Sequence, residues 1–156
     1  MGQQDEIAVK LLVVRTAEPV GMTMAEESLF INEAFYQAFR ARDLAVMEDL
    51  WAREAPVVCI HPGWAAIVDR EEIMRSWRGI FENPDSPKIF CRRPQAFDLG
   101  EAMLVVCYEE MESGLLVAAN IFRRERDELK IVHHHAGQSN PPPGGLGETN
   151  EEGTLQ

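Results

Sequence analysis

A change in hydrophobic period near residue 88 constrains this chain more than any other feature. Before that point, apolar residues recur mainly at steps of three and four, which is the spacing of amphipathic helices. From Lys88 onward the period is two, as in strands that bury one face. A chain with its helices first and its strands last is expected to fold as an α+β domain, without alternating βαβ units.

Four elements are predicted before residue 88. They are helices over residues 27–41, 43–51 and 69–83 and a short strand over residues 57–60. Asp69 and Glu72 have the spacing of a capping box at the start of the third helix. Pro62 and Gly63 stop the strand in a turn.

Four strands are predicted after residue 88, near residues 88–98, 102–112, 115–125 and 129–137. Their connections have only two or three residues, so neighbouring strands must be antiparallel. The predicted fold class is therefore α+β, with helices packed on one face of a curved antiparallel sheet. The sequence has no glycine-rich phosphate loop.

The chain divides into a central domain and two ends. Residues 27–140 carry the dense pattern, whereas residues 1–26 form an N-terminal extension without a sustained period. Two interpretations of that extension stay open: a start codon assigned too early, or an extra strand built from residues 7–14. Residues 141–156 combine proline, glycine and acidic residues, which predicts a flexible acidic C-terminal tail.

The formal net charge is −11, and residues 1–27 and 141–156 together carry more than half of it. An acidic surface repels phosphate backbones, so no nucleic-acid partner is expected. No apolar run approaches the ~20 residues of a membrane span, so no membrane partner is expected either. Cys59, Cys91 and Cys107 stand among apolar residues, as buried reduced thiols do. We therefore expect a soluble cytoplasmic protein.

The four histidines occur in two places, His61 in CIHPGW and the other three in IVHHHAGQS. On a regular strand, His133 and His135 share one face with Ile131, and His134 points to the other face. Imidazole has a pKa suited to proton transfer near neutrality. His133 and His135 are therefore candidate acid/base groups, and His134 is expected to be structural.

A zinc site built from His61, His133 and His135 is chemically reasonable, because two histidines on one strand can join a third from elsewhere. Nothing in the sequence places His61 near the other two, and no Cys/His zinc spacing occurs. No metal site is therefore predicted.

Five segments in a fixed order carry a resemblance to a known family. They are FYQAFRARDLAVMEDLWA, VVCIHPGW, DREEIMRSWRGIF, AANIF and IVHHHAGQS. Together, over residues 28–140, they resemble the SnoaL-like branch of the nuclear transport factor 2-like superfamily. The resemblance implies a cone-shaped, cystatin-like α+β barrel: a curved antiparallel sheet wraps the N-terminal helices and leaves an apolar pocket. It also implies a homodimer.

The resemblance implies candidate catalytic positions as well. Histidines of the closing strand that commonly face the pocket match His133 and His135, and His61 is the third candidate. In the family a small polar residue often follows these histidines. Gly137 stands at that position, so this chain lacks a hydroxyl that could join a hydrogen-bond relay there. Related isomerases use an acidic base, but the nearest acids, Asp98 and Glu109, lie near strand ends and are expected to be solvated.

Other pocket candidates follow from residue type. Large aromatic side chains line both protein cores and apolar pockets, and a core position is the favoured interpretation for Trp77. A buried amide inside an apolar strand needs hydrogen-bond partners, so Asn120 either orients a ligand or holds a neighbouring strand. The candidates are Phe35, Tyr36, Trp64, Trp77 and Asn120.

Two functions remain open, because this fold hosts both enzymes and non-catalytic domains. In the first, the domain binds a small apolar molecule in the cone pocket. Any catalysis there would be proton transfer without a cofactor, of the isomerase, dehydratase (lyase) or cyclase type. In the second, the chain is a non-catalytic dimeric interaction module whose outer sheet face docks a protein partner. The first is favoured, and whether the protein is an enzyme is left open.

Overall fold

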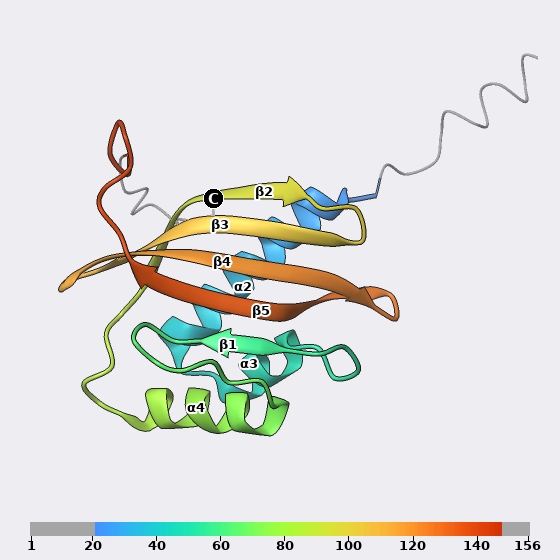
Figure 1. The fold of residues 1–156 in the computed structure, drawn as a ribbon, viewed down its shortest axis with the longest axis horizontal. Helices are drawn as coiled ribbons and strands as arrows, with labels where there is room; N and C mark the ends of the chain where they lie inside the picture. The colour runs from blue at the N-terminus through green and yellow to red at the C-terminus, as the bar shows by residue number, and fades with distance from the viewer. Residues whose placement is uncertain (1–20, 148–156) are drawn as a thin grey trace, which may run out of the picture.

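The computed structural model describes residues 21–147. Its elements are α2 (Met24–Ala41), α3 (Leu44–Leu50), β1 (Val58–Ile60), α4 (Arg70–Glu82), β2 (Phe90–Asp98), β3 (Ala102–Met111), β4 (Gly114–Glu125) and β5 (Glu128–Gln138) (Figure 1). This order confirms the predicted α+β fold class. The segment 7–14, predicted as a possible extra strand, lies outside the described residues.

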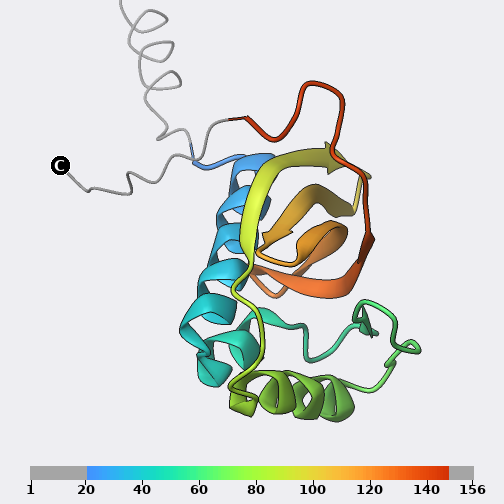
Figure 2. The same ribbon diagram turned by 90° about the vertical axis from the view of Figure 1, so that its left-hand side faces the viewer.

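The strands form one five-stranded sheet in the order β1-β5-β4-β3-β2. The four long strands are antiparallel neighbours, and β1 pairs in parallel with β5. Figure 2 shows the sheet curling round one side of α2, with α4 beyond the β1 edge. The predicted curved sheet wrapped on N-terminal helices is therefore confirmed.

Side-chain caps start each of the three helices. Thr23 and Glu26 form a capping box at α2. Asp43 accepts a hydrogen bond from an amide in the first turn of α3, and Asp69 accepts one from the amide of Glu72 in α4. These caps set the helix starts close to the predicted positions.

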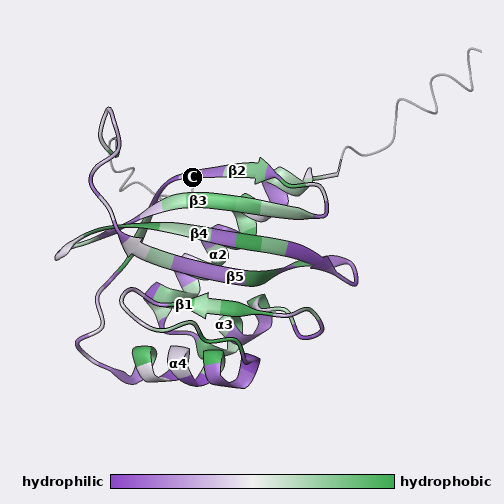
Figure 3. Cartoon of the chain, in the orientation of Figure 1, coloured by the Kyte–Doolittle hydropathy of each residue, from purple (hydrophilic) through white to green (hydrophobic). Residues whose placement is uncertain are grey.

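The core lies between α2 and the inner face of the sheet. Along β3, Met103, Val105, Cys107 and Glu109 are buried, and the residues between them are only half-buried. Figure 3 shows that β3 is largely hydrophobic, whereas the middle of β5 is polar where the three histidines lie. The inner face is therefore apolar along most of the sheet and becomes polar near one end.

The first residues of the expected flexible tail, 141–147, are held against β2. Arg92 donates hydrogen bonds to the carbonyls of Leu146 and Gly147, and Arg93 donates to the carbonyl of Gly145. The rest of that predicted tail lies outside the described residues. No helix within residues 21–147 is both long and apolar enough to cross a bilayer.

Candidate functional site

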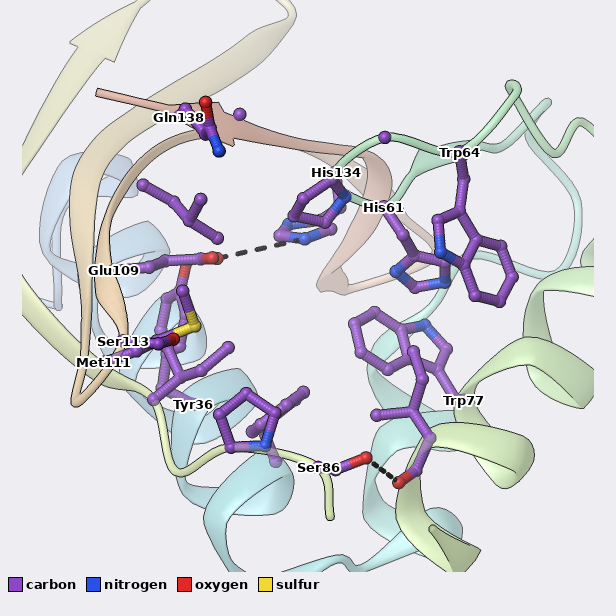
Figure 4. A pocket seen from close by; sticks show the side chains of 18 of the residues that line it. Tyr36, His61, Trp64, Trp77, Ser86, Glu109, Met111, Ser113, His134 and Gln138 are labelled. Carbon is purple, nitrogen blue, oxygen red and sulfur yellow. Dashed lines mark hydrogen bonds and ion pairs between the residues drawn. The ribbon is translucent and has the colours of Figure 1, made fainter.

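A cavity of about 720 Å³ opens between α2, α4, the turn after β1 and the inner faces of β3, β4 and β5. Figure 4 shows its two walls: His134 and Glu109 approach one another from the sheet, and aromatic rings stand opposite them. Five predicted candidates line this cavity together, namely Phe35, Tyr36, His61, Trp64 and Trp77.

Aromatic rings packed edge to face form the wall opposite the sheet. The ring of Trp77 lies 4.7 Å from that of His61 and 5.5 Å from that of Phe35 between centroids. Trp77 is buried, in line with its predicted core position, but its ring also forms part of the cavity wall. Trp64 is 53% exposed and lies at the rim, 4.8 Å from the ring of His61. The wall suits flat apolar ligands.

His61 is held by Ser76 of α4. Nε2 of His61 lies 2.8 Å from Oγ of Ser76, and that hydroxyl donates to the carbonyl of Ile73. The serine proton is thus engaged, so Nε2–H of His61 is the donor to Oγ. Burial lowers the pKa of His61 to about 4. The imidazole is therefore neutral near pH 7.

The prediction that His133 and His135 face the cavity is wrong. Phe122 of β4 pairs with Ile131, and the preceding residue, Ile121, pairs with His133, so Val132 is an extra residue in β5. A bulge of this kind reverses the alternation of faces beyond it. The outer face of the sheet therefore carries His133 and His135, and the inner face carries His134.

Glu109 is buried, which contradicts its predicted solvated position. Its residue is 2% exposed, and Oε1 accepts a 2.8 Å hydrogen bond from the hydroxyl of Tyr36. Burial raises the pKa of Glu109 to about 7, although the hydrogen bond from Tyr36 acts in the opposite direction. The signal was present in the sequence, because Glu109 follows Val105 and Cys107 at the inward period of β3.

Glu109 and His134 form a buried acid–imidazole pair. Oε1 of Glu109 lies 3.9 Å from Nε2 of His134, and the two side chains are almost inaccessible to water. Burial, reinforced by the neighbouring histidines, lowers the pKa of His134 to about 3. Because burial favours the neutral form of each group, the proton that titrates between Oε1 of Glu109 and Nε2 of His134 is expected on the carboxyl group.

Asn120 lies behind the cavity wall and is not among the lining residues. Its Oδ1 lies 2.6 Å from Nδ1 of His134, and its Nδ2 donates a 2.8 Å hydrogen bond to Oδ1 of Asn32 on α2. It thus ties a strand to a helix and touches the imidazole of the pair. Gly137 also lines the cavity, and a Cβ at that position would meet no atom within 4 Å.

The remaining candidates lie elsewhere. Asp98 is exposed at the end of β2, as predicted. Cys59, Cys91 and Cys107 are free thiols, two of them buried and Cys91 half-buried. Within residues 21–147, no group of three His, Cys, Asp or Glu side chains is placed to hold a metal ion.

Comparison with solved structures shows the same fold. A proposed dehydratase of the NTF2-like family from Streptomyces avermitilis is 30% identical, with 74% of this chain and 96% of that one covered and a TM-score of 0.67. A protein from Thiobacillus denitrificans, described as a candidate calcium/calmodulin-dependent protein kinase type II association domain, is 28% identical. There the match covers 79% of this chain and 100% of the other, with a TM-score of 0.67. These two relatives carry names of different functional classes.

A curated relative is the F-box protein SKIP8 of Arabidopsis thaliana, 24% identical over 108 residues. The match covers 68% of this chain and 47% of the relative, so the chain spans about half the length of that protein. Residues 30–140 match the family model described as the SnoaL-like domain. The chain therefore belongs to the SnoaL-like domain family, within the nuclear transport factor 2-like superfamily.

Proposed function

We propose that this protein binds a small, uncharged and largely apolar molecule in the cone cavity, and that Glu109 transfers a proton to and from it. The observation that carries the proposal is the carboxyl of Glu109, buried in the wall of a cavity of about 720 Å³. That volume lies within the usual range of small-molecule sites. An anionic ligand would lose hydration against the aromatic wall, and no Lys or Arg is among the described lining residues to compensate.

Glu109 suits general acid–base chemistry near neutral pH. A group with a pKa of about 7 is present in both protonation states, so it can take a proton from a ligand and return it. His134 faces it at 3.9 Å with a neutral imidazole, so the exchangeable proton stays on the carboxyl group. The place in the site predicted for closing-strand histidines is thus taken by His134, which faces Glu109, and His61 is proposed to orient the ligand from the opposite wall.

Isomerisation and dehydration are the reactions that such a site favours, because both move one proton from carbon and deliver one to oxygen or to another carbon. No cofactor is needed for either step. The 30% identical NTF2-like relative with a proposed dehydratase name supports this choice.

Deuterium exchange tests the proposal directly. The wild-type protein is incubated in deuterated buffer with a panel of flat aromatic and alicyclic ketones, and exchange at the carbon next to the carbonyl is followed by NMR. At least one ketone is expected to exchange faster with the wild type than with Glu109→Gln, which keeps the shape and removes the base. Equal exchange rates for the two proteins would overturn the role of Glu109.

A matched control comes from the outer face. The double variant His133→Ala/His135→Ala removes two imidazoles that do not line the cavity, so it should retain ligand binding and exchange. Thermal-shift measurements with the same ketones at pH 6 and pH 8 check binding separately. Trp64→Ala is expected to reduce the ligand-induced rise in Tm, because Trp64 forms the rim.

The outer sheet face supports a second proposal, association of two copies of this chain. The outward side chains in the middle of β3 and β4 are uncharged. Leu104, Val106 and Tyr108 of β3 pair with Ile121, Ala119 and Val117 of β4. In Figures 1 and 2, α2 covers the opposite face of the sheet. In a chain with a net charge of −11, such a face is where two copies meet without repulsion. The relative described as an association domain supports this choice.

Mass in solution tests the association. Sedimentation equilibrium should give a dimer for the wild type and a monomer for Val117→Glu, which places a charge in the centre of the face. Val68→Glu changes a residue that is already 69% exposed and should remain dimeric. A monomeric wild type at high micromolar concentration would overturn the proposal. An unchanged dimer in Val117→Glu would assign the contact to another surface.

A further inference from the structure

We infer that Asn120 and Asn32 are positioning residues that hold His134 in the tautomer with its proton on Nδ1, so that Nε2 presents a lone pair to Glu109. The inference rests on the proposed function, because it concerns the same acid–imidazole pair. It adds the device that decides which of the two partners carries the proton.

The device is a chain of directed hydrogen bonds from β2 to the cavity. Nδ2 of Asn32 donates to Sγ of Cys91 at 3.5 Å. Oδ1 of Asn32 accepts from Nδ2 of Asn120 at 2.8 Å, and Oδ1 of Asn120 lies 2.6 Å from Nδ1 of His134. Because an amide oxygen only accepts, Nδ1 of His134 must carry the proton.

A second arrangement would satisfy the same atoms if both amides were turned. Cys91 would then donate to the oxygen of Asn32, and the amide nitrogen of Asn120 would donate to Nδ1 of His134. The proton of the imidazole would move to Nε2 and point at Glu109. The two arrangements therefore present opposite tautomers to the cavity.

Tyr36 decides between them. Its hydroxyl donates to Oε1 of Glu109 at 2.8 Å, so its oxygen can only accept on the side of Asn120. Nδ2 of Asn120 lies 3.4 Å from that oxygen, close enough for a second hydrogen bond. In the turned arrangement two oxygens would face each other there without a proton between them. Tyr36 therefore favours the arrangement in which Asn120 accepts from His134.

Burial makes this selection effective. Asn32 is 1% exposed, Asn120 2% and His134 3%, so water does not compete for these bonds. In this tautomer Nε2 of His134 carries a lone pair and no proton. Any proton between His134 and Glu109 must therefore come from the carboxyl group. This agrees with the raised pKa of Glu109. The other titratable groups that face the pair are Tyr36 from α2, Cys107 from β3, and Cys59 and His61 from β1 and its turn.

Nitrogen NMR of protein labelled with ¹⁵N-histidine reads the tautomer directly. The resonances of His134 are assigned by their loss in His134→Gln. At pH 7 we expect a protonated Nδ1 and a bare Nε2 for His134 in the wild type. A protonated Nε2 in the wild type would overturn the inference.

Asn120→Leu removes the acceptor at similar volume. The Nε2–H tautomer, which the side chain of free histidine prefers, should then appear. The pKa of Glu109 should fall, because Nε2–H stabilises the carboxylate. Retention of the Nδ1–H tautomer in this variant would overturn the positioning role. Phe122→Leu is the control, since it changes a buried residue on the same face of β4 outside the hydrogen-bond chain, and its His134 should keep the wild-type tautomer.

Tyr36→Phe keeps the inference testable if Asn120→Leu does not fold. It removes the oxygen that opposes the turned amides, so both tautomers of His134 should be observed. Asn32→Leu should have a smaller effect, because Asn120 keeps Tyr36 as its second acceptor. The tautomer readout needs no ligand. A correct tautomer without ketone exchange would thus overturn the proposed function and leave this inference standing.

Discussion

Oε1 of Glu109 lies 3.9 Å from Nε2 of His134, although the two residues come from strands that are not neighbours in the sheet. β4 separates β3 from β5, and two strands that flank a third lie ~10 Å apart in a flat sheet. The curvature of this sheet turns their inner faces toward one another, so the two side chains span the gap. The pair therefore depends on the cone shape as well as on the residues.

Glu109→Gln should change how stability depends on pH. The pKa of Glu109 rises from 4.5 to about 7 on folding, so its contribution is fully present below pH 4.5 and is lost as the pH rises through 7. Relative to the wild type, the variant should gain about 2 to 3 kcal/mol between pH 5 and pH 8. Urea unfolding at both pH values measures this difference. Parallel stability profiles for the two proteins would contradict a buried, protonated Glu109.

His61 should affect the pH dependence of stability in the direction opposite to Glu109. Its pKa falls from 6.5 to about 4 on folding, so its contribution is present above pH 6.5 and is lost as the pH falls toward 4. Replacement with Phe keeps an aromatic ring between Trp64 and Trp77 and removes the titration. The acid-side loss of stability should shrink by up to about 3 kcal/mol, measured by urea unfolding between pH 4 and pH 7. An equal loss of stability between pH 7 and pH 4 in the variant and the wild type would show that His61 is not neutral in the folded protein.

Trp77 should tolerate Phe far better than Ala. Trp77→Ala opens a hole between α2 and α4 and should cost about 3 to 5 kcal/mol of unfolding free energy. Trp77→Phe should cost clearly less. It keeps most of the ring contacts, and it removes a buried Nε1–H that has no hydrogen-bond partner within the described part of the chain. Chemical denaturation of both variants checks the ranking, and equal losses would contradict this account.

Glu125 should stabilise the segment that leads into β1. Its carboxylate accepts hydrogen bonds from the amides of Arg53, Glu54 and Ala55. Glu125→Ala should cost about 1 to 3 kcal/mol, because these amides lose a charged acceptor. Glu128→Ala, on the exposed start of β5, is the control and should cost little. Amide hydrogen exchange of residues 53–55 should accelerate in the first variant only.

Local patterns in the sequence were sufficient to predict the helices, the strands and the antiparallel meander. The helical stripe of α2 and the period-two runs of β3 and β4 depend only on residues close together in the chain. Short connections then left one way to pair the strands. The resemblance to the SnoaL-like family added the cone shape and the apolar pocket, and residue type suggested the aromatic side chains that line it.

Tertiary structure decided which polar groups meet in the cavity. The extra residue Val132 reverses the alternation on β5, so the cavity receives His134, while His133 and His135 face outward. Strand periodicity cannot show this, because a bulge is set by pairing with the neighbouring strand. The alternation along β3 places Glu109 on the inward face. That it is buried so near the end of the strand follows only from the curvature of the sheet. Periodicity is local and can be read from one strand, whereas register and curvature depend on several strands packed together.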